Sequence, residues 1–335
     1  METLSNQHIK PKVWQMIGKT INKNSTSAEA IQQAELDFEV LKHPNTHILP
    51  SGNHVISDKS FYTFRTDTEA ILGDKIGRDY KVVQNTHAFD FFDSIVGGRG
   101  GIQYETAGAL GYGETIFITA KLPGHIRVGR DDLIDQYLFL TSTHDGMGCI
   151  NIAFTPVRIW CSNTLNAALK NCSNCIKIRH TASAEEKLKS AHTMLGLSDQ
   201  LATELSAIFN RWTRVKITDP QVKRLIQLAI VPNKETYEKL KTGKEDELSS
   251  HYNNMVSSVF DYAMTSPTQQ ENTTRGTLFG AYNCITGYFQ NVRNFRDEES
   301  KFKSIMYGTG LQRGQTAFDL CSDFARQGNA ALVLN

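Results

Sequence analysis

The chain has 335 residues, which is long enough to bury a large core and to form two domains of ordinary size. Its 36 basic and 35 acidic residues nearly cancel to a formal net charge of +1, a balance that argues against coating duplex DNA through bulk charge but permits local basic patches. No apolar run approaches the roughly 20 residues of a membrane span and no basic-then-apolar leader opens the chain, so we expect a soluble, intracellular protein without a membrane partner.

Residues 1–45 predict an N-terminal extension that contains one helix. Ser27 is a suitable N-cap residue, and small and apolar residues follow it at helical spacing. Residues 38–40 predict a short strand that leaves this helix. Residues 42–59 are rich in His, Pro, Asn and Gly and therefore predict a loop or an irregular hairpin.

Residues 46–181 predict a core domain built on an antiparallel sheet. Residues 81–84 read as a strand, and Asn85 and Thr86 cap a helix that starts at Ala88. Turns rather than helices separate the strands that follow, a spacing typical of antiparallel hairpins and not of repeated βαβ units. The strands predicted on either side of this helix cover residues 61–65, 102–108, 115–122, 137–143 and 150–161.

The most informative stretch is a predicted hairpin that feeds a helix. A strand from Tyr137 breaks at residues 144–146, whose His-Asp-Gly sequence is a turn signature, and a second strand follows. Residues 162–164 (Ser-Asn-Thr) are good N-caps for a helix over residues 165–170.

Residues 182–335 predict a helical region. Leucines and isoleucines recur at helical spacing up to Trp212, and Asp219 and Pro220 start a further helix that Pro232 stops. The fold class that these patterns predict is α+β, with an antiparallel β-sheet, long hairpins and packed helices in the N-terminal half and a mostly helical C-terminal half. The later helices are expected over residues 252–264, 278–289 and 316–334.

His144 and Asp145 invite a catalytic interpretation, with the imidazole as acid or base and the carboxylate as its orienter. A tight turn is the simpler explanation, because Asp-Gly supplies the positive φ that a two-strand connection needs. We assign no catalytic residue. The alternative hypothesis is an enzyme or counter-defence factor whose pocket gathers the side chains at the bends of the sheet: His144, Asp145, Arg158, Cys161 and Asn163.

The cysteines offer at most a weak metal site. Cys172 and Cys175 form one CxxC pair that Cys161 and His180 could complete, but a second paired knuckle is missing. The glycine-rich segment at residues 108–113 lacks a GK[ST] ending and fits a hairpin tip better than a phosphate cradle. We therefore expect no metal, no cofactor and free thiols.

Basic residues gather after the predicted hairpin, and no acidic residue lies between Val157 and Ala184. Aromatic residues stand on the neighbouring strands, so a sheet with a basic rim could track the backbone of a single strand and stack its bases. The candidate phosphate contacts are Arg158, Lys170, Lys177, Arg179 and Lys216, and Tyr112 is the candidate stacking residue.

The chain resembles the phage- and plasmid-related family called domain of unknown function 932. The resemblance is carried by Trp14 and Gly18 and by segments spread along nearly the whole chain. These segments are AEAIQQAELDFEV (28–40), IGRDYKVVQNTHAFDFFDSIVG (76–97), ETAGALGYGETIFITAKLPG (105–124), YLFLTSTHDGMG (137–148), TPVRIWCSNTL (155–165), IRHT (178–181) and NTTRGTLFGAYNCITGY (272–288).

The resemblance implies a protein of bacteriophages, plasmids or other mobile elements that works in the cytoplasm of the bacterial host. Its order of helix, long hairpins and helix is similar to the core of ring-forming single-strand annealing proteins, an analogy at the level of fold. We therefore expect a homo-oligomer that acts in recombination or replication and binds or anneals single-stranded DNA without a cofactor.

Overall fold

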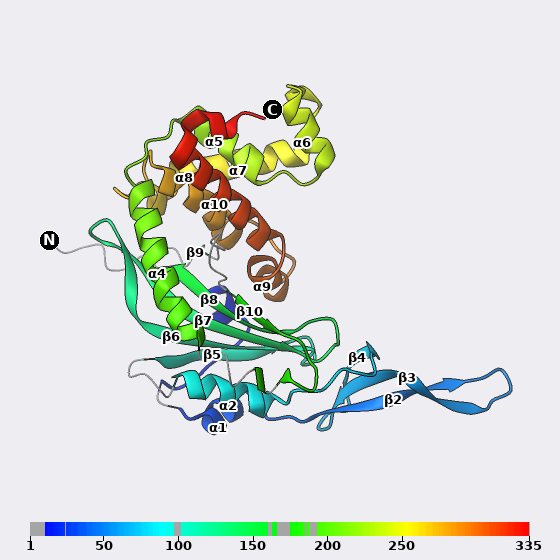
Figure 1. Cartoon of the computed structure of the whole chain (residues 1–335). Helices are drawn as coiled ribbons and strands as arrows, with labels where there is room; N and C mark the ends of the chain where they lie inside the picture. The colour runs from blue at the N-terminus through cyan, green and yellow to red at the C-terminus, as the bar shows by residue number, and fades with distance from the viewer. Residues whose placement is uncertain are drawn as a thin grey trace.

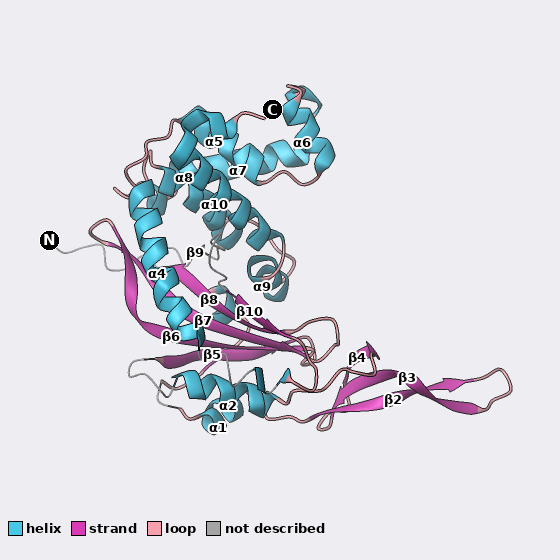
Figure 2. Cartoon of the chain, in the orientation of Figure 1, coloured by secondary structure: helices cyan, strands magenta, loops and turns pink. Residues whose placement is uncertain are grey.

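The structure, a computed structural model, describes residues 11–23, 25–96, 102–159, 163–165, 175–184, 186–187 and 193–334. The fold is α+β, as the sequence predicts, with antiparallel sheets in the N-terminal half and packed helices in the C-terminal half (Figures 1 and 2). No helix in the described part of the chain combines the length and the apolar character that crossing a bilayer requires.

A seven-stranded antiparallel sheet forms the centre of the molecule. Its strand order is β1-β5-β6-β7-β8-β10, and β9 pairs with β8. The predicted hairpin after Tyr137 is confirmed as β7 and β8. The strands are β1 (Lys19–Thr20), β5 (Gln103–Leu110), β6 (Thr115–Val128), β7 (Asp132–Thr143), β8 (Ile150–Arg158), β9 (Asn163–Thr164) and β10 (Cys175–Ile178).

A second, three-stranded sheet projects from the body as an arm (Figure 1). It consists of β2 (Val40–Ile48), β3 (His54–Arg65) and β4 (Ile71–Ile76). Of the two alternatives expected over residues 42–59, a loop or an irregular hairpin, the structure shows the irregular hairpin. The chain there forms two long strands with one register shift between Pro44 and Thr46, because cross-strand pairing outweighs the poor strand propensity of these residues.

The N-terminal segment contributes one short strand to the main sheet. The first short helix, η1 (Val13–Met16), precedes β1, which pairs with β5, and the boundary expected at residue 45 falls inside β2. Helix α1 (Ser27–Gln33) starts one residue after its cap, Thr26, and packs on α2 (Asn85–Val96). The strand expected over residues 81–84 is absent, because the Gln84 side chain instead bonds both backbone groups of Val40.

The C-terminal half is helical from residue 193, as predicted. Pro220 occupies the first turn of α5, where its missing N–H costs nothing. The helices are α4 (Thr193–Trp212), α5 (Asp219–Ala229), α6 (Lys234–Lys241), η2 (Glu245–Glu247), α7 (Ser250–Thr265), η3 (Pro267–Gln269), α8 (Leu278–Asn291), α9 (Glu298–Met306), α10 (Thr309–Gln327) and η4 (Gly328–Leu332).

An aromatic cluster joins the helical half to one face of the main sheet. Phe302 of α9 is fully buried, with its ring centroid 5.0 Å from that of Phe117 and 5.9 Å from that of Phe139. Trp14 extends the cluster, at 5.1 Å from Tyr137. Burial of such rings is the largest apolar contribution that single side chains make, so this contact fixes the position of α9 over the strands.

A buried ion pair forms a second connection between the two halves. The Arg158 guanidinium of β8 is fully buried and donates to both carboxylate oxygens of Asp132, at 2.7 to 3.0 Å. It also donates to the carbonyl of Thr268 at 3.1 Å, and Thr273 donates its hydroxyl to Asp132 at 2.8 Å. Strands β7 and β8 are thereby tied to the loop that precedes α8.

The variant Arg158→Met should lower the free energy of unfolding by about 3–5 kcal/mol, because it leaves the Asp132 carboxylate buried without its cation. The double variant Arg158→Met/Asp132→Leu should recover much of this loss, since neither charge then remains buried. Urea denaturation of the three proteins measures both effects. A loss below about 1 kcal/mol in the single variant, the size expected of an exposed pair, would contradict this role.

Candidate functional site

A groove of about 680 Å³ lies between the main sheet and helices α9 and α10. Its floor comes from β7, β8 and β10, whose registers place Thr141 opposite Asn151 and Asn151 opposite Lys177. Its wall comes from the end of α9 and the start of α10. The residues that line it are Phe139, Thr141, Asn151, Ala153, Cys175, Lys177, Met306, Tyr307, Leu311, Gln312, Gln315 and Thr316.

The lining of this groove combines a cation, amides and aromatic rings. Lys177 is its one charged residue among the described side chains, and no ion pair joins Lys177 to a carboxylate in the described chain. Gln312 offers an amide donor and acceptor, whereas Asn151 offers its carbonyl oxygen, because its amide nitrogen already donates to Thr141 and to the carbonyl of Cys149. Tyr307 remains 39% exposed beside the buried Phe139 ring. Such a surface can attract an anion and pack against a flat ring.

Two of the predicted phosphate contacts lie together at the edge of this groove. Lys177 stands on β10, and Arg179 follows that strand directly. Both side chains are exposed, and the alternation of a strand places them on the same side. A third candidate, Lys170, lies outside the described residues.

Arg158 must be removed from the predicted phosphate contacts. Its side chain has no exposed surface and is held by Asp132 and Thr268. Sequence reasoning left the direction of this side chain open, because a one-residue change of register reverses the face of a strand. The ion pair makes Arg158 a structural residue.

Lys216 and Tyr112 are exposed but stand apart from the groove. Lys216 follows α4 and forms an isolated bridge with Thr277. Tyr112 is 71% exposed at the β5–β6 turn, and three strand spacings from β6 to β10 put it roughly 14 Å or more from Lys177. Four aromatic residues on the strands of the main sheet are buried: Tyr104, Phe117, Tyr137 and Phe139.

The alternative pocket around His144 does not form. Arg158 pairs with Ile134, ten residues along β7 from His144, so the two side chains lie roughly 30 Å apart at opposite ends of the hairpin. Asn163 pairs with Arg158 at the far end. Cys161 lies outside the described residues, and the length of the two strands separates His144 and Asp145 from Arg158 and Asn163.

The turn interpretation of residues 144–146 is confirmed. Gly146 has a φ of +74°, and the Asp145 carboxylate accepts the backbone N–H of Met147 at 2.9 Å. By contrast, Asn163 and Thr164 do not cap a helix as expected, because they pair with β8 as strand β9. The helix expected over residues 165–170 falls largely on residues that the structure does not describe.

The metal site predicted at low weight has two members, Cys161 and Cys172, outside the described residues. Within the described ranges, no group of three His, Cys, Asp or Glu side chains could hold a metal ion. Cys175 lines the groove, whereas His180 is buried beside Tyr80.

Two buried histidines lie beneath the β7–β8 turn. His144 has no exposed surface, and its Nε2 lies 2.8 Å from Oδ1 of Asn85. His180 is stacked on Tyr80 with ring centroids 4.9 Å apart. Burial, with a smaller effect of His180, lowers the pKa of His144 to about 3, and burial lowers the pKa of His180 to about 4. Both rings are therefore neutral at physiological pH.

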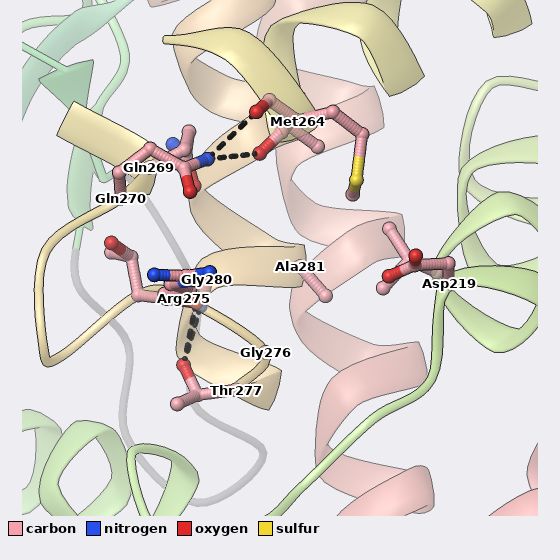
Figure 3. A pocket seen from close by; sticks show the side chains of 12 residues that line it. Asp219, Met264, Gln269, Gln270, Arg275, Gly276, Thr277, Gly280 and Ala281 are labelled. Atoms are coloured by element: carbon pink, nitrogen blue, oxygen red, sulfur yellow. Dashed lines mark hydrogen bonds between the residues drawn. The ribbon is translucent and has the colours of Figure 1, made fainter. Parts of the chain in front are cut away.

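A second cavity, of about 410 Å³, lies at the start of α8 (Figure 3). The Gln270 amide there donates to the carbonyl of Met264 at 2.9 Å, and Thr277 caps the helix by accepting from Gly280 at 3.1 Å. Its charged lining residues, Asp219 and Arg275, have opposite signs. This cavity therefore offers less attraction to an anion than the groove.

Sequence reasoning missed the wall of the groove, which Met306, Tyr307 and Leu311 form. The available signal was a mostly polar helix with Phe302, Ile305 and Met306 on its apolar side, which ends at Tyr307 and Gly308 and is followed by a new helix start. That pattern marks a bend between two helices but does not reveal which strand they face.

Stability should fall as the pH drops below about 6.5, because the unfolded chain then protonates His144 and His180 while the folded chain does not. At about pH 5 each imidazole lowers the free energy of unfolding by about 2 kcal/mol. This pH lies about 1.5 units below the ordinary pKa of histidine, and each unit contributes about 1.36 kcal/mol. Urea denaturation should show a fall of about 4 kcal/mol between about pH 7.5 and pH 5, and His180→Phe should remove about half of it. If the free energy of unfolding of His180→Phe falls by the same amount as that of the parent protein, the lowered pKa of His180 is contradicted.

The family comparison agrees with the resemblance seen in the sequence. A family model described as Domain of unknown function (DUF932) matches residues 74–306, more than two thirds of the chain. The matched range includes strands β5 to β10 of the main sheet and ends at Met306 in the wall of the groove. No curated protein and no solved structure matches the chain. The chain therefore belongs to the family called domain of unknown function 932.

Proposed function

We propose that this chain binds single-stranded DNA in the groove between the main sheet and α9–α10. The observation that carries the proposal is the lining of the groove, in which Lys177 is the one charged described residue and lies beside amides and the exposed Tyr307 ring. A cation for the phosphate and a ring for the base are the two elements that single-strand binding requires.

An unpaired strand fits this lining better than a duplex. The amides of Asn151 and Gln312 lie inside the groove, where they can reach the edge of a base only if that base is not already paired. Lys177 and Arg179 stand at the edge strand, where a sugar-phosphate backbone can run past them. The nearly neutral net charge of the whole chain limits non-specific binding to duplex DNA.

We propose further that the chain works by binding or annealing strands during recombination or replication of a bacteriophage or other mobile element, in the bacterial cytoplasm and without a cofactor. Such a protein assembles as a homo-oligomer. The tip of the arm supports self-association, because Ile48 and Ile56 are 72% and 69% exposed. The pairing of Ile48 with His54 places the two isoleucines on one face.

Removing both edge cations should weaken single-strand binding. The variant Lys177→Ala/Arg179→Ala should lower affinity on the order of tenfold at low salt. It should also reduce the slope of log K against log salt by about 1.4, since each phosphate contact on a single strand contributes about 0.7. Fluorescence anisotropy with labelled single-stranded and duplex DNA across a salt series measures both quantities.

The matched control is Lys234→Ala/Lys241→Ala, which removes the same charge from exposed positions of α6. This variant should keep the affinity and the salt slope of the parent protein. Equal losses in both double variants would mean that net charge, and not the groove, governs binding. Unchanged binding in Lys177→Ala/Arg179→Ala would contradict the assignment of these two residues as phosphate contacts.

Filling the groove without changing charge gives a second test. Ala153 is half-buried on the floor, so Ala153→Phe places a ring where a base would stack. Loss of one stacked base costs ~1–3 kcal/mol, so affinity should drop by about tenfold or more. Ala109→Phe, at a half-buried position of β5, is the control. Comparable binding by both variants would place the strand elsewhere on the molecule.

A further inference from the structure

His180 anchors the strand that carries the basic edge of the groove. It lies two residues after the end of β10, is 4% exposed, and its carbonyl accepts the backbone N–H of Lys81 at 3.0 Å. Neither ring nitrogen has a hydrogen-bond partner among the described residues. The ring is held instead by its stack on Tyr80, whose hydroxyl donates to the carbonyl of Thr143 at 2.8 Å.

Burial around His180 outweighs the groups that favour a charged ring. Burial is the dominant effect, and it disfavours the imidazolium. The backbone of Lys81 and, after it, the Asp145 carboxylate on the β7–β8 turn favour a proton on His180, but these smaller effects do not offset burial. The neighbouring His144, whose Nε2 lies 2.8 Å from Oδ1 of Asn85 of α2, is itself neutral because burial lowers its pKa to about 3. The site therefore accommodates a neutral ring and rejects a charged one.

The strand that His180 anchors lies at the edge of the main sheet as far as the chain is described. β10 pairs with β8 from Cys175 opposite Ala153 to Ile178 opposite Ile150, and no other strand among the described residues pairs with it. Edge strands have the lowest local stability of a sheet, so a modest change at the anchor alters the population of the released state.

We propose that protonation of His180 releases the end of β10 from the sheet, so that acid dismantles the edge of the groove that carries Lys177 and Arg179. The consequence for DNA rests on the proposed function, whereas the release of β10 does not. Acidification would then weaken single-strand binding by displacing the two cations, even though it adds positive charge to the protein.

The size of the effect follows from linkage. In the released strand His180 titrates near the ordinary value of 6.5, whereas in the closed structure burial lowers its pKa to about 4. Between these two values each unit of pH favours the released state about tenfold. At about pH 5 the released population should therefore be about 30-fold larger than at neutral pH.

Hydrogen exchange of the full chain without DNA tests the release directly. After correction for the intrinsic dependence of exchange on pH, protection of residues 175–181 should fall about 30-fold from about pH 7.5 to pH 5. The core of the β6–β7 hairpin should keep its protection. His180→Phe retains an aromatic ring against Tyr80 and cannot take up a proton, so it should abolish the change.

Two results would overturn the proposal. One is constant protection of residues 175–181 in the parent protein. The other is an equal loss of protection in His180→Phe. If that variant does not fold, an NMR titration of the His180 ring in the parent protein decides the question, since a value near 6.5 with β10 still protected excludes the mechanism. The hydrogen-exchange experiment contains no DNA, so its outcome does not depend on whether the chain binds single-stranded DNA.

Discussion

The groove depends on the contact that seats α9 on the sheet. Phe302 packs against the stacked rings of Phe117 and Phe139 and is fully buried, so α9 cannot move away from β6 and β7 without exposing a large apolar surface. Tyr307 begins the wall at the end of that helix, 5.7 Å from Phe302. The contact of Phe302 therefore covers one part of the sheet with α9 and leaves the neighbouring part uncovered as the groove.

The two margins of the groove differ in strength. On one side, α9 and α10 rest on the aromatic cluster, and the buried Arg158–Asp132 pair holds the same helical half to the far end of β7 and β8. On the other side, β10 is held, as far as the chain is described, by its pairing with β8 and by the stack of His180 on Tyr80. A rigid wall facing a weakly held edge suits a site that must admit and release a long, flexible ligand.

The sequence predicted elements with strong local signals and failed where tertiary contacts decide. The β7–β8 hairpin and its Asp-Gly turn follow from alternation and from the positive φ at Gly146. Arg158 was assigned to phosphate because its face could not be known before its partner, Asp132, was located. The groove itself was missed, since Lys177 and Tyr307 are 130 positions apart and only packing brings them together.

Ultraviolet crosslinking of the protein to single-stranded DNA, followed by mass spectrometry of the crosslinked peptides, tests the central claim most directly. The proposed site predicts crosslinks on β10 and on the peptide that contains Tyr307, because a strand bound in the groove would bring its bases against the Tyr307 ring and the Cys175 side chain. Crosslinks confined to the arm or to α6, or the absence of any crosslink under conditions of tight binding, would contradict the assignment of the groove as the DNA site.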